Sequence, residues 1–291
     1  MRCKSNAATE VLLWEVSSAI TLGGKSITEY LLGHSPAELR RLTVQAELLR
    51  PITERMLREA GLRPGMRVLD LGCGAGDVSL LAAELVGPEG SVVGVDRVAS
   101  AIEFAASRAE HGKVRNVTFR QGTEADLGDE APFDLAVGRY VLLYQPDPTG
   151  FVRAVAARLR AGGTVAFHEP DLSRDSESLP PVPIFDRVVN EVIQVFRAGV
   201  SSPNVTTRLA SIFAEAGLAS PCGFCERLVG MEGSELFFRW VAASYATIRS
   251  AVDPDGEPVE VERLATEFGA AVAAVHGQAL VADQWCAWAK V

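Results

Sequence analysis

The stretch that decides the fold is residues 68–77, which run Val-Leu-Asp-Leu-Gly-Cys-Gly-Ala-Gly-Asp. Its apolar start predicts a short buried strand, and Gly72, Gly74 and Gly76 predict a tight turn that leads into a helix. A glycine turn lets a ligand approach the backbone, because no Cβ stands in the way. Strand, glycine turn and helix in this order are typical of a nucleoside-binding βαβ unit.

An acidic residue follows at the distance that such a unit requires. Asp96 ends a second apolar strand, residues 91–95, roughly 20 residues after the turn, where a carboxylate accepts hydrogen bonds from both ribose hydroxyls. The G-x-G-x-G spacing, with Asp77 after the last glycine, differs from the G-x-G-x-x-G of dinucleotide-binding proteins. Asp70, two residues before Gly72, suits a ligand with a cationic amino group better than one with phosphates.

The whole motif closely resembles the first motif of the class I S-adenosylmethionine (SAM)-dependent methyltransferases, and the similarity extends over roughly residues 66–170. The resemblance implies a Rossmann-like α/β fold, with a seven-stranded, mostly parallel sheet and helices on both faces. It also implies SAM as the cofactor and S-adenosylhomocysteine as the product. Gly72 and Gly74 would then lie against the methionine part of SAM, and Asp96 would hold the ribose. Arg97 would lie near the adenine, although a solvated surface arginine explains it equally well.

Two later stretches resemble further motifs of the family. Residues 117–127 match its third-strand motif, which commonly ends Gly-Asp-Ala with the acid near the adenine amino group. In this chain Thr123 and Glu124 follow Gly122, so we expect a hydroxyl or a carboxylate to accept from the amine, the alternative being an ordinary loop. The backbone of Gly138, in a stretch that resembles the fourth motif, would face the methionine part of SAM.

Two residues that precede the glycine turn complete the expected cofactor site. Tyr30 would cover the sulfonium, where cation–π attraction favours an aromatic ring. Gln45 would reach the carboxylate of the cofactor. Packing against the core explains both residues as well as binding does.

The candidate catalytic residues are His168 and Glu169, at the end of the predicted fifth strand. Pro170 holds Glu169 in an extended conformation, and its carboxylate would act as a general base or stabilise positive charge. The alternative is a carboxylate that caps a nearby helix or pairs with an arginine. Because strand neighbours point to opposite faces, His168 and Glu169 should not share a metal ion, and we predict no metal site.

Strand and helix patterns alternate between residues 66 and 169, which predicts a parallel sheet. We expect one methyltransferase domain over residues 1–291, with a helical cap over the carboxyl edge of the sheet. Its core would comprise residues 61–169, 204–230 and 277–291, and its cap residues 1–60, 170–203 and 231–276.

The composition of the chain limits the classes of molecule that it is expected to bind. The net charge of −9 and the absence of a basic patch argue against nucleic acid, so we expect a small-molecule substrate. Residues 11–20 are too short and too charged for a membrane span or a signal segment, which predicts a cytoplasmic protein. Cys222 and Cys225 have redox or zinc spacing, but no second pair exists, so we favour inert thiols. The sequence leaves the oligomeric state open, a homo-oligomer included.

The resemblance is to the branch that holds quinone, sterol and bacterial natural-product methyltransferases. It implies transfer of the SAM methyl group to a small molecule, at carbon or oxygen. The many aromatic residues of the expected cap, among them Phe185, Phe237 and Phe238, suggest an apolar or aromatic acceptor. A SAM-binding cyclase or isomerase on the same fold is one alternative. An NAD-linked oxidoreductase is another, and the glycine spacing argues against it.

Overall fold

The computed structural model describes residues 36–128 and 131–291, with side chains from Arg41 onward. Tyr30 therefore lies outside the described residues. The chain forms two compact units. The sheet unit comprises Leu42–Asp175, Ser201–Val229 and Leu280–Val291, and the helical unit consists chiefly of Ser176–Val200 and Gly230–Ala279.

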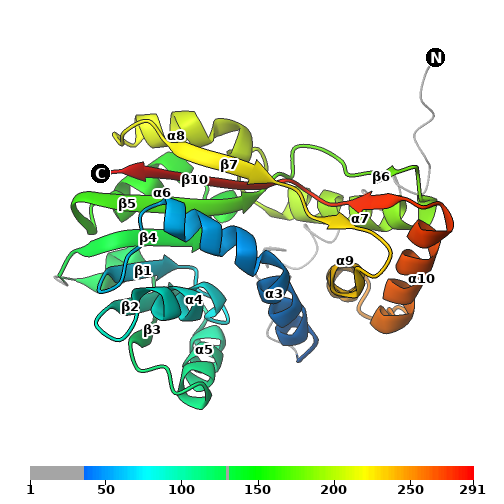
Figure 1. The fold of residues 1–291 in the computed structure, drawn as a ribbon, viewed down its shortest axis with the longest axis horizontal. Coiled ribbons are helices and arrows are strands. Elements are labelled where there is room, and N and C mark those ends of the chain that lie inside the picture. Colours follow the sequence, from blue (N-terminus) through cyan, green and yellow to red (C-terminus); the bar gives the residue numbers. More distant parts are fainter. Residues whose placement is uncertain (1–35, 129–130) are drawn as a thin grey trace. The chain divides into compact units, whose positions relative to one another are not determined.

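A seven-stranded sheet forms the centre of the sheet unit (Figure 1). Its strands are β1 (Arg67–Leu71), β2 (Ser91–Asp96), β3 (Val117–Gln121), β4 (Phe133–Arg139), β5 (Leu159–Pro170), β7 (Cys222–Glu226) and β10 (Gln284–Lys290). They lie in the order β3-β2-β1-β4-β5-β10-β7, and β10 is the one strand of this sheet that runs in the opposite direction to the other six. The predicted fold class is confirmed. The strand order reverses between β1 and β4, which is where open α/β sheets bind their ligands.

Helices cover both faces of this sheet. One face carries α3 (Pro36–Glu59, in the sheet unit from Leu42), α4 (Asp77–Val86) and α5 (Ala99–His111), and the other carries α6 (Pro148–Ala156) and α8 (Leu209–Glu215). Successive residues of β5 point to opposite faces. Ala166 packs into the core with Leu49 of α3. The Phe167 ring instead lies 6.3 Å from that of Phe151 on α6 and 6.2 Å from that of Phe213 on α8, between ring centroids.

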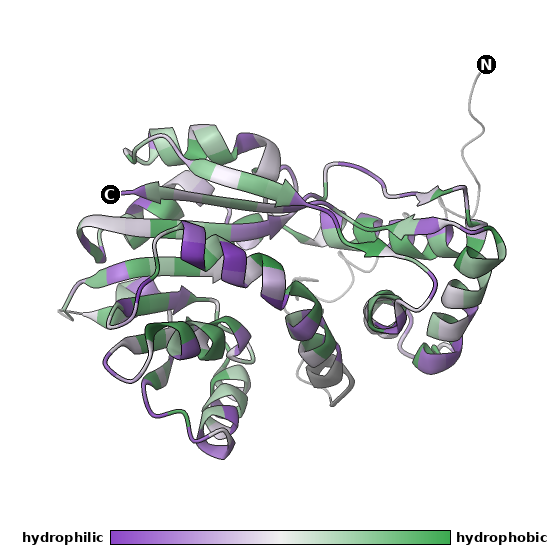
Figure 2. Ribbon diagram, in the orientation of Figure 1, coloured by the Kyte–Doolittle hydropathy of each residue, from purple (hydrophilic) through white to green (hydrophobic). Residues whose placement is uncertain are grey.

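Hydropathy follows this arrangement. Helix α4 is mostly apolar along its length, with buried residues on most turns, whereas α3 carries charged residues on its outer side (Figure 2). The buried side of α3 contributes Leu49, Ile52 and Met56 to the same core as the sheet. Residues 42–59 of this helix are therefore built into the sheet unit.

The helical unit has a core of its own. Its helices are α7 (Pro183–Gly199), α9 (Glu235–Val252) and α10 (Val261–Ala274), beside a short sheet of β6 (Ser178–Leu179), β9 (Gln278–Leu280) and β8 (Val229–Gly230) that the sequence patterns did not predict. The Phe185 ring lies 6.0 Å from that of Phe237, 6.2 Å from that of Phe238 and 5.3 Å from that of Phe268. These aromatic residues pack against one another, so their number alone says nothing about an aromatic ligand.

The insertion between the last two strands of the large sheet matches the expected helical patterns. Strands β7 and β10 pair antiparallel although residues 227–283 separate them in the sequence. Within the part of the chain that the structure describes, no helix is long and apolar enough to cross a membrane.

Candidate functional site

The glycine turn follows β1 at the point where the strand order reverses. Gly74 and Gly76 both have positive φ, +50° and +81°. A Cβ on Gly76 would lie 2.9 Å from the Phe119 ring and 3.0 Å from Ala105, so this glycine serves close packing of the turn. A Cβ on Gly74 would meet no atom within 4 Å. Open space therefore lies over Gly74, which leaves room for a ligand against the backbone.

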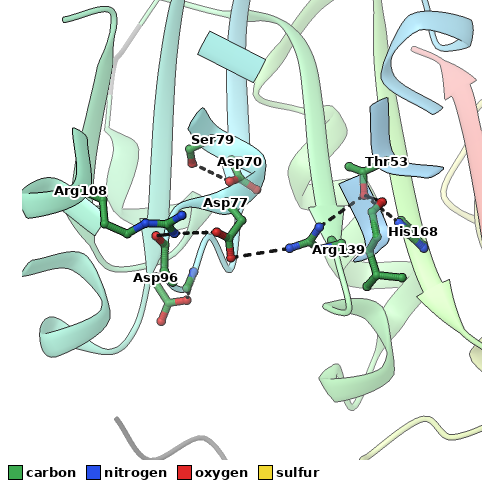
Figure 3. A network of polar contacts seen from close by, with 11 residues as sticks. Thr53, Asp70, Asp77, Ser79, Asp96, Arg108, Arg139 and His168 are labelled. Atoms are coloured by element: carbon green, nitrogen blue, oxygen red, sulfur yellow. Dashed lines mark hydrogen bonds and ion pairs between the residues drawn. The ribbon is translucent and has the colours of Figure 1, made fainter. Parts of the chain in front are cut away.

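The carboxylate of Asp96 is tied to this turn. Its Oδ2 accepts a hydrogen bond from the Gly74 N–H at 2.9 Å, and its Oδ1 accepts from the Val98 N–H at 2.9 Å (Figure 3). A carboxylate has about four acceptor positions, so each oxygen keeps capacity for one more donor. The half-buried Asp96 thus stands beside the open side of the turn with acceptors to spare. This chemistry fits the two hydroxyls of a ribose.

The loop after β3 uses Thr123 locally. Its hydroxyl oxygen accepts from the Ala125 N–H at 3.2 Å, and its own N–H and O–H donate to Asp126 Oδ2 at 2.8 and 3.0 Å. This capping box begins the 3₁₀ helix η1 (Glu124–Leu127). Glu124 is half-buried and Arg97 is exposed. The adenine contacts of Thr123, Glu124 and Arg97 stay predictions.

Asp70 lies beneath the turn rather than on it. The side chain is 1% exposed, and its Oδ2 accepts a hydrogen bond from the Ser79 hydroxyl at 2.5 Å, which joins β1 to α4 (Figure 3). Burial raises the pKa of Asp70 to about 7, although the Ser79 hydrogen bond and the charge of Arg139 lower it. No sequence pattern predicted the contact between Asp70 and Ser79. Binding of a cationic amino group by Asp70 stays a prediction.

The other predicted cofactor residues lie as follows. Gln45 is 8% exposed on α3. A Cβ on Gly138 would lie 2.9 Å from the Phe167 ring, so this glycine also has a packing reason. The cofactor contacts predicted for four residues stay predictions: those of Gln45, Gly138, Gly72 and Tyr30.

A row of charged side chains crosses the strand ends beside the turn. Asp77, the first residue of α4, contacts Arg108 of α5 at 2.6 Å through Oδ1, and its Oδ2 lies 3.8 Å from Arg139 Nη2 at the end of β4 (Figure 3). The Arg139 side chain is 9% exposed. Neither Asp77 nor Arg139 was among the predicted site residues. The available signal was their position, directly after the glycine turn and after Gly138.

His168 belongs to a buried polar network. Its Nδ1 lies 3.1 Å from Thr53 Oγ1 on α3, and its Nε2 lies 3.1 Å from Gln284 Oε1 on β10. Burial, and then the charge of Arg139, lower the pKa of His168 to about 3. The imidazole is therefore neutral at physiological pH.

Hydrogen-bond donors and acceptors fix the tautomer of His168. Gln284 Nε2 donates to the Ala282 carbonyl at 2.9 Å, so its Oε1 must be the atom that faces His168 and Tyr140. The Tyr140 hydroxyl donates to this oxygen at 2.6 Å, and Nε2 of His168 donates to it as well. Nδ1 is then the acceptor, and it shares the single hydrogen of the Thr53 hydroxyl with the Leu49 carbonyl, which lies 3.2 Å from the same oxygen.

The same network holds the turn after β4. Tyr140 has φ +61°, a left-handed conformation that costs a non-glycine residue roughly 1–2 kcal/mol. Its N–H donates to the His168 carbonyl at 2.8 Å, and its hydroxyl is anchored on Gln284. Strained backbone of this kind clusters at functional sites, and the anchors come from β5 and β10.

Glu169 holds the next residues of that turn. Its Oε1 accepts from the Val141 and Leu142 N–H groups at 2.9 and 2.8 Å, and its Oε2 lies 3.5 Å from the Leu143 nitrogen. These contacts cap the 3₁₀ helix η2 (Leu142–Tyr144). Burial raises the pKa of Glu169 to about 8, against the lowering effect of the three amides. The geometry is that of the capping alternative, and a catalytic role stays a prediction.

Two further motifs are the adjacent pair His168 and Glu169, considered above as metal ligands, and the cysteine pair Cys222 and Cys225. His168 and Glu169 point to opposite faces of β5, toward α3 and η2. Within residues 36–128 and 131–291, no group of three His, Cys, Asp or Glu side chains is placed to hold a metal ion. Cys222 and Cys225 are free, exposed thiols three residues apart on β7, so their side chains leave opposite faces of the strand.

Comparison with known proteins gives a family match that covers most of the sheet unit and part of the helical unit. A family model described as a methyltransferase domain matches residues 62–216. Aklanonic acid methyltransferase DauC of Streptomyces sp. (strain C5) is 35% identical over 43% of this chain and 57% of its own length. Nocamycin O-methyltransferase of Saccharothrix syringae is 34% identical over 43% of this chain and 45% of its own. The chain thus spans about half the length of these curated relatives.

Solved structures share the fold. The YcgJ protein of Bacillus subtilis superposes with a TM-score of 0.53 over 82% of this chain and 97% of its own, at 20% identity. At that identity the likeness concerns the fold alone.

The open space over Gly74 gives a first prediction. Gly74→Val should abolish binding of S-adenosylhomocysteine, because the side chain enters the space that a ligand needs. Gly217→Val is the matched control, since Gly217 also has positive φ (+88°) and no atom within 4 Å of a Cβ, but lies after α8. Both variants should lose comparable stability. Calorimetry in which folded Gly74→Val binds as wild type does would contradict the assignment of the turn.

The raised pKa of Glu169 gives a second prediction. The pKa of about 8 in the folded protein exceeds the ordinary value of 4.5, so the folded protein holds this proton more tightly than the unfolded chain. The resulting stability is complete below the unfolded pKa and is lost as pH rises through the folded pKa. Between about pH 5 and 8 the free energy of unfolding should fall, by up to about 1.4 kcal/mol per pH unit from this residue.

Urea unfolding at several pH values measures this slope. Glu169→Gln keeps a neutral acceptor for the amides of η2 and cannot ionise, so its slope should be flatter than that of wild type. Asp70 titrates in both proteins and cancels in the comparison. Parallel profiles would mean that Glu169 is already ionised in the folded protein at pH 5.

Proposed function

The chain belongs to the class I SAM-dependent methyltransferase family, and from this premise we propose that it transfers the SAM methyl group to a small molecule. The observation that carries the proposal is Asp96, hydrogen-bonded to Gly74 beside the open side of the turn, with acceptors left for a ribose. The glycine turn and the carboxylate come from adjacent strands, at the point where the strand order reverses.

The residues at the carboxyl edge of the sheet need to supply little of the chemistry of methyl transfer. SAM carries a methyl group that is already activated by its sulfonium, so the protein mainly orients the two reactants and excludes water. Asp96 would hold the ribose, and Gly74 would admit the ligand to the backbone. Glu169, Gln284 and His168 keep the turn after β4 in its strained form. The neighbouring backbone is thereby fixed before any ligand arrives.

For the acceptor we propose an apolar or aromatic small molecule, methylated at carbon or oxygen. The support is the names of the relatives, which act on aklanonic acid and, as an O-methyltransferase, on nocamycin. Another relative, from Lactococcus lactis, is a demethylmenaquinone methyltransferase. Release of one S-adenosylhomocysteine per product from a panel of such acceptors tests the proposal. Product that forms without this release would favour a cyclase or isomerase instead.

Asp96 provides the sharpest binding prediction. Asp96→Ala should weaken S-adenosylhomocysteine by about 10- to 100-fold, because hydrogen bonds to a charged partner contribute about 1.5–3 kcal/mol. Asp147→Ala is the matched control, because Asp147 caps α6 through the Gly150 N–H at 2.9 Å in the same unit. That variant should lose stability without losing affinity. A decrease of less than about threefold for Asp96→Ala would remove Asp96 from the ribose site.

We also propose a test of Glu169 as the general base. A base must be ionised, and its raised pKa means that the methylation rate should climb with pH up to about 8. Glu169→Gln should then lower the single-turnover rate by at least about tenfold and leave cofactor affinity nearly intact. If Glu169 only caps η2, the variant keeps the wild-type rate and pH profile per folded molecule, as judged by a thermal melt.

A further inference from the structure

Trp240 of α9 carries a buried hydrogen-bond donor without a partner. In the part of the chain that the structure describes, its indole Nε1 is the one buried side-chain nitrogen or oxygen that makes no hydrogen bond. The residue as a whole is half-buried. An indole N–H can only donate, and a buried tryptophan normally finds an acceptor for it. Because an unpaired donor that is removed from water costs stability, its position in the fold needs a reason.

Other buried polar residues of the helical unit are paired. The Ser178 hydroxyl donates to Asp186 Oδ2 at 3.0 Å. The Ser176 N–H donates to Asn190 Oδ1 at 2.7 Å, and Asn190 Nδ2 donates back to the Ser176 carbonyl at 2.8 Å. These contacts tie the segment before α7 to α7 itself. The unpaired Trp240 N–H therefore stands out within its own unit.

Trp240 does not lie on the sides of α9 that pack within the unit. Helix α9 contacts both α7 and α10 (Figure 1). The Phe237 ring stacks on that of Phe185 of α7, and Arg239 pairs with Glu262 of α10 at 2.8 Å. Trp240 lies on a third side, about 100° around the helix from Arg239. Helical spacing places on this side Leu236, Trp240, Ala243, Ser244 and Thr247.

This third side of α9 has the make-up of a small-molecule site. Ser244 is buried and the other four residues are half-buried. Leu236, Ala243 and the Trp240 ring provide apolar area. Sites for small molecules are mostly apolar and fix their ligand through a few polar groups. A matching ligand therefore has an apolar frame and an oxygen with a free lone pair, because the indole cannot accept a hydrogen bond.

The connections of the chain tie the helical unit to the edge of the large sheet that holds the proposed cofactor site. Three short links join the two units. They leave the sheet at Pro170, Glu226 and Gln284, which are neighbours in the strand register. Strands β1, β4 and β5 are parallel, so Pro170 ends its strand at the same edge as the glycine turn. A ligand of the helical unit is thus best assigned as the second reactant.

We propose that Trp240 donates its indole N–H to an oxygen of the methyl acceptor. This assignment rests on the proposed function and narrows the substrate class, from apolar molecules in general to those with a carbonyl or similar oxygen on an apolar frame. A site built around a donor rejects an analogue that lacks the acceptor atom, because the donor is then left unpaired. Trp240 would accordingly determine specificity without taking part in methyl transfer.

The free protein provides the first test. Trp240→Phe keeps an aromatic ring and removes the N–H, so it identifies the Trp240 signal in a nitrogen–proton correlation spectrum of isotope-labelled indoles. Hydrogen bonding moves an indole proton downfield. The Trp240 proton should therefore resonate upfield of that of N-acetyltryptophanamide in the same buffer. A signal equally far downfield would show that the N–H already has a partner, and would overturn the proposal.

Two probes that differ in one oxygen provide the second test. α-Tetralone and tetralin share a bicyclic apolar frame, and α-tetralone alone has a carbonyl. α-Tetralone should move the Trp240 proton downfield, whereas tetralin should not. Trp240→Phe should weaken α-tetralone by about three- to tenfold and leave tetralin within about twofold of wild type. With an acceptor that the protein methylates, the variant should raise KM and leave S-adenosylhomocysteine affinity unchanged.

Trp285→Phe is the matched control, because it makes the same change at an exposed tryptophan of β10. It should leave both probe affinities unchanged. If Trp240→Phe does not fold, phenylalanine variants of the other three tryptophans assign the Trp240 signal by elimination, and its shift with α-tetralone decides. An equal response to both probes, or none to α-tetralone, would overturn the proposal. A protein that passes these probe tests but releases no S-adenosylhomocysteine with any acceptor would overturn the proposed function instead.

Discussion

The hydrogen bond from the Gly74 N–H to Asp96 Oδ2 links the two elements on which the site depends. It joins the turn after β1 to the end of β2, which are neighbours in the sheet but 22 residues apart in the chain. The bond forms with Gly74 at φ +50°. The same conformation leaves the space over the turn open. One backbone constraint thus positions the carboxylate and clears the place beside it.

Around this turn, buried ionisable groups serve mainly to hold backbone. Asp70 binds Ser79 and so fixes α4 against β1, while Glu169 binds the amides at the start of η2. Perturbed pKa values often mark catalytic groups. Here burial is the first cause in each case, and the partners are those of structural anchors. The fold uses polar side chains to keep strained turns at the carboxyl edge in place, and this preorganisation is what a binding site needs.

The two arginines beside Asp77 differ in how deeply they are buried and in how closely they pair with that carboxylate. Arg108 is fully explained by its contacts with the glycine turn. Arg139 is more deeply buried and less well satisfied, although both lie beside the same carboxylate. The Arg139 nitrogens without a hydrogen-bond partner are not fully buried, so the two arginines differ in how closely they pair and not in an unsatisfied buried charge. Residues of this kind are visible only when distances and exposure are read together.

Local pattern was enough to predict the strands and helices of the sheet unit, the glycine turn and the acidic residue after β2. Each of these depends on neighbours within about 20 residues: glycines permit positive φ, apolar runs form buried strands, and the βαβ spacing brings the carboxylate to the turn. The helical insertion before the last strand also followed from the order of the patterns, whereas the antiparallel pairing of β7 and β10 was implied only by the family resemblance.

The tertiary structure alone decided what the side chains at that edge contact. Thr53 and Gln284 lie 115 and 116 residues from His168, and no local spacing announces them. The partners of Glu169 come from the turn in which Tyr140 adopts φ +61°. Phe185, Phe237 and Phe238 became a core because their helices pack together. The sequence determines which backbone conformation a short segment prefers. Which side chains become buried, and which of them pair, depends on the distant segments that come together when the chain folds.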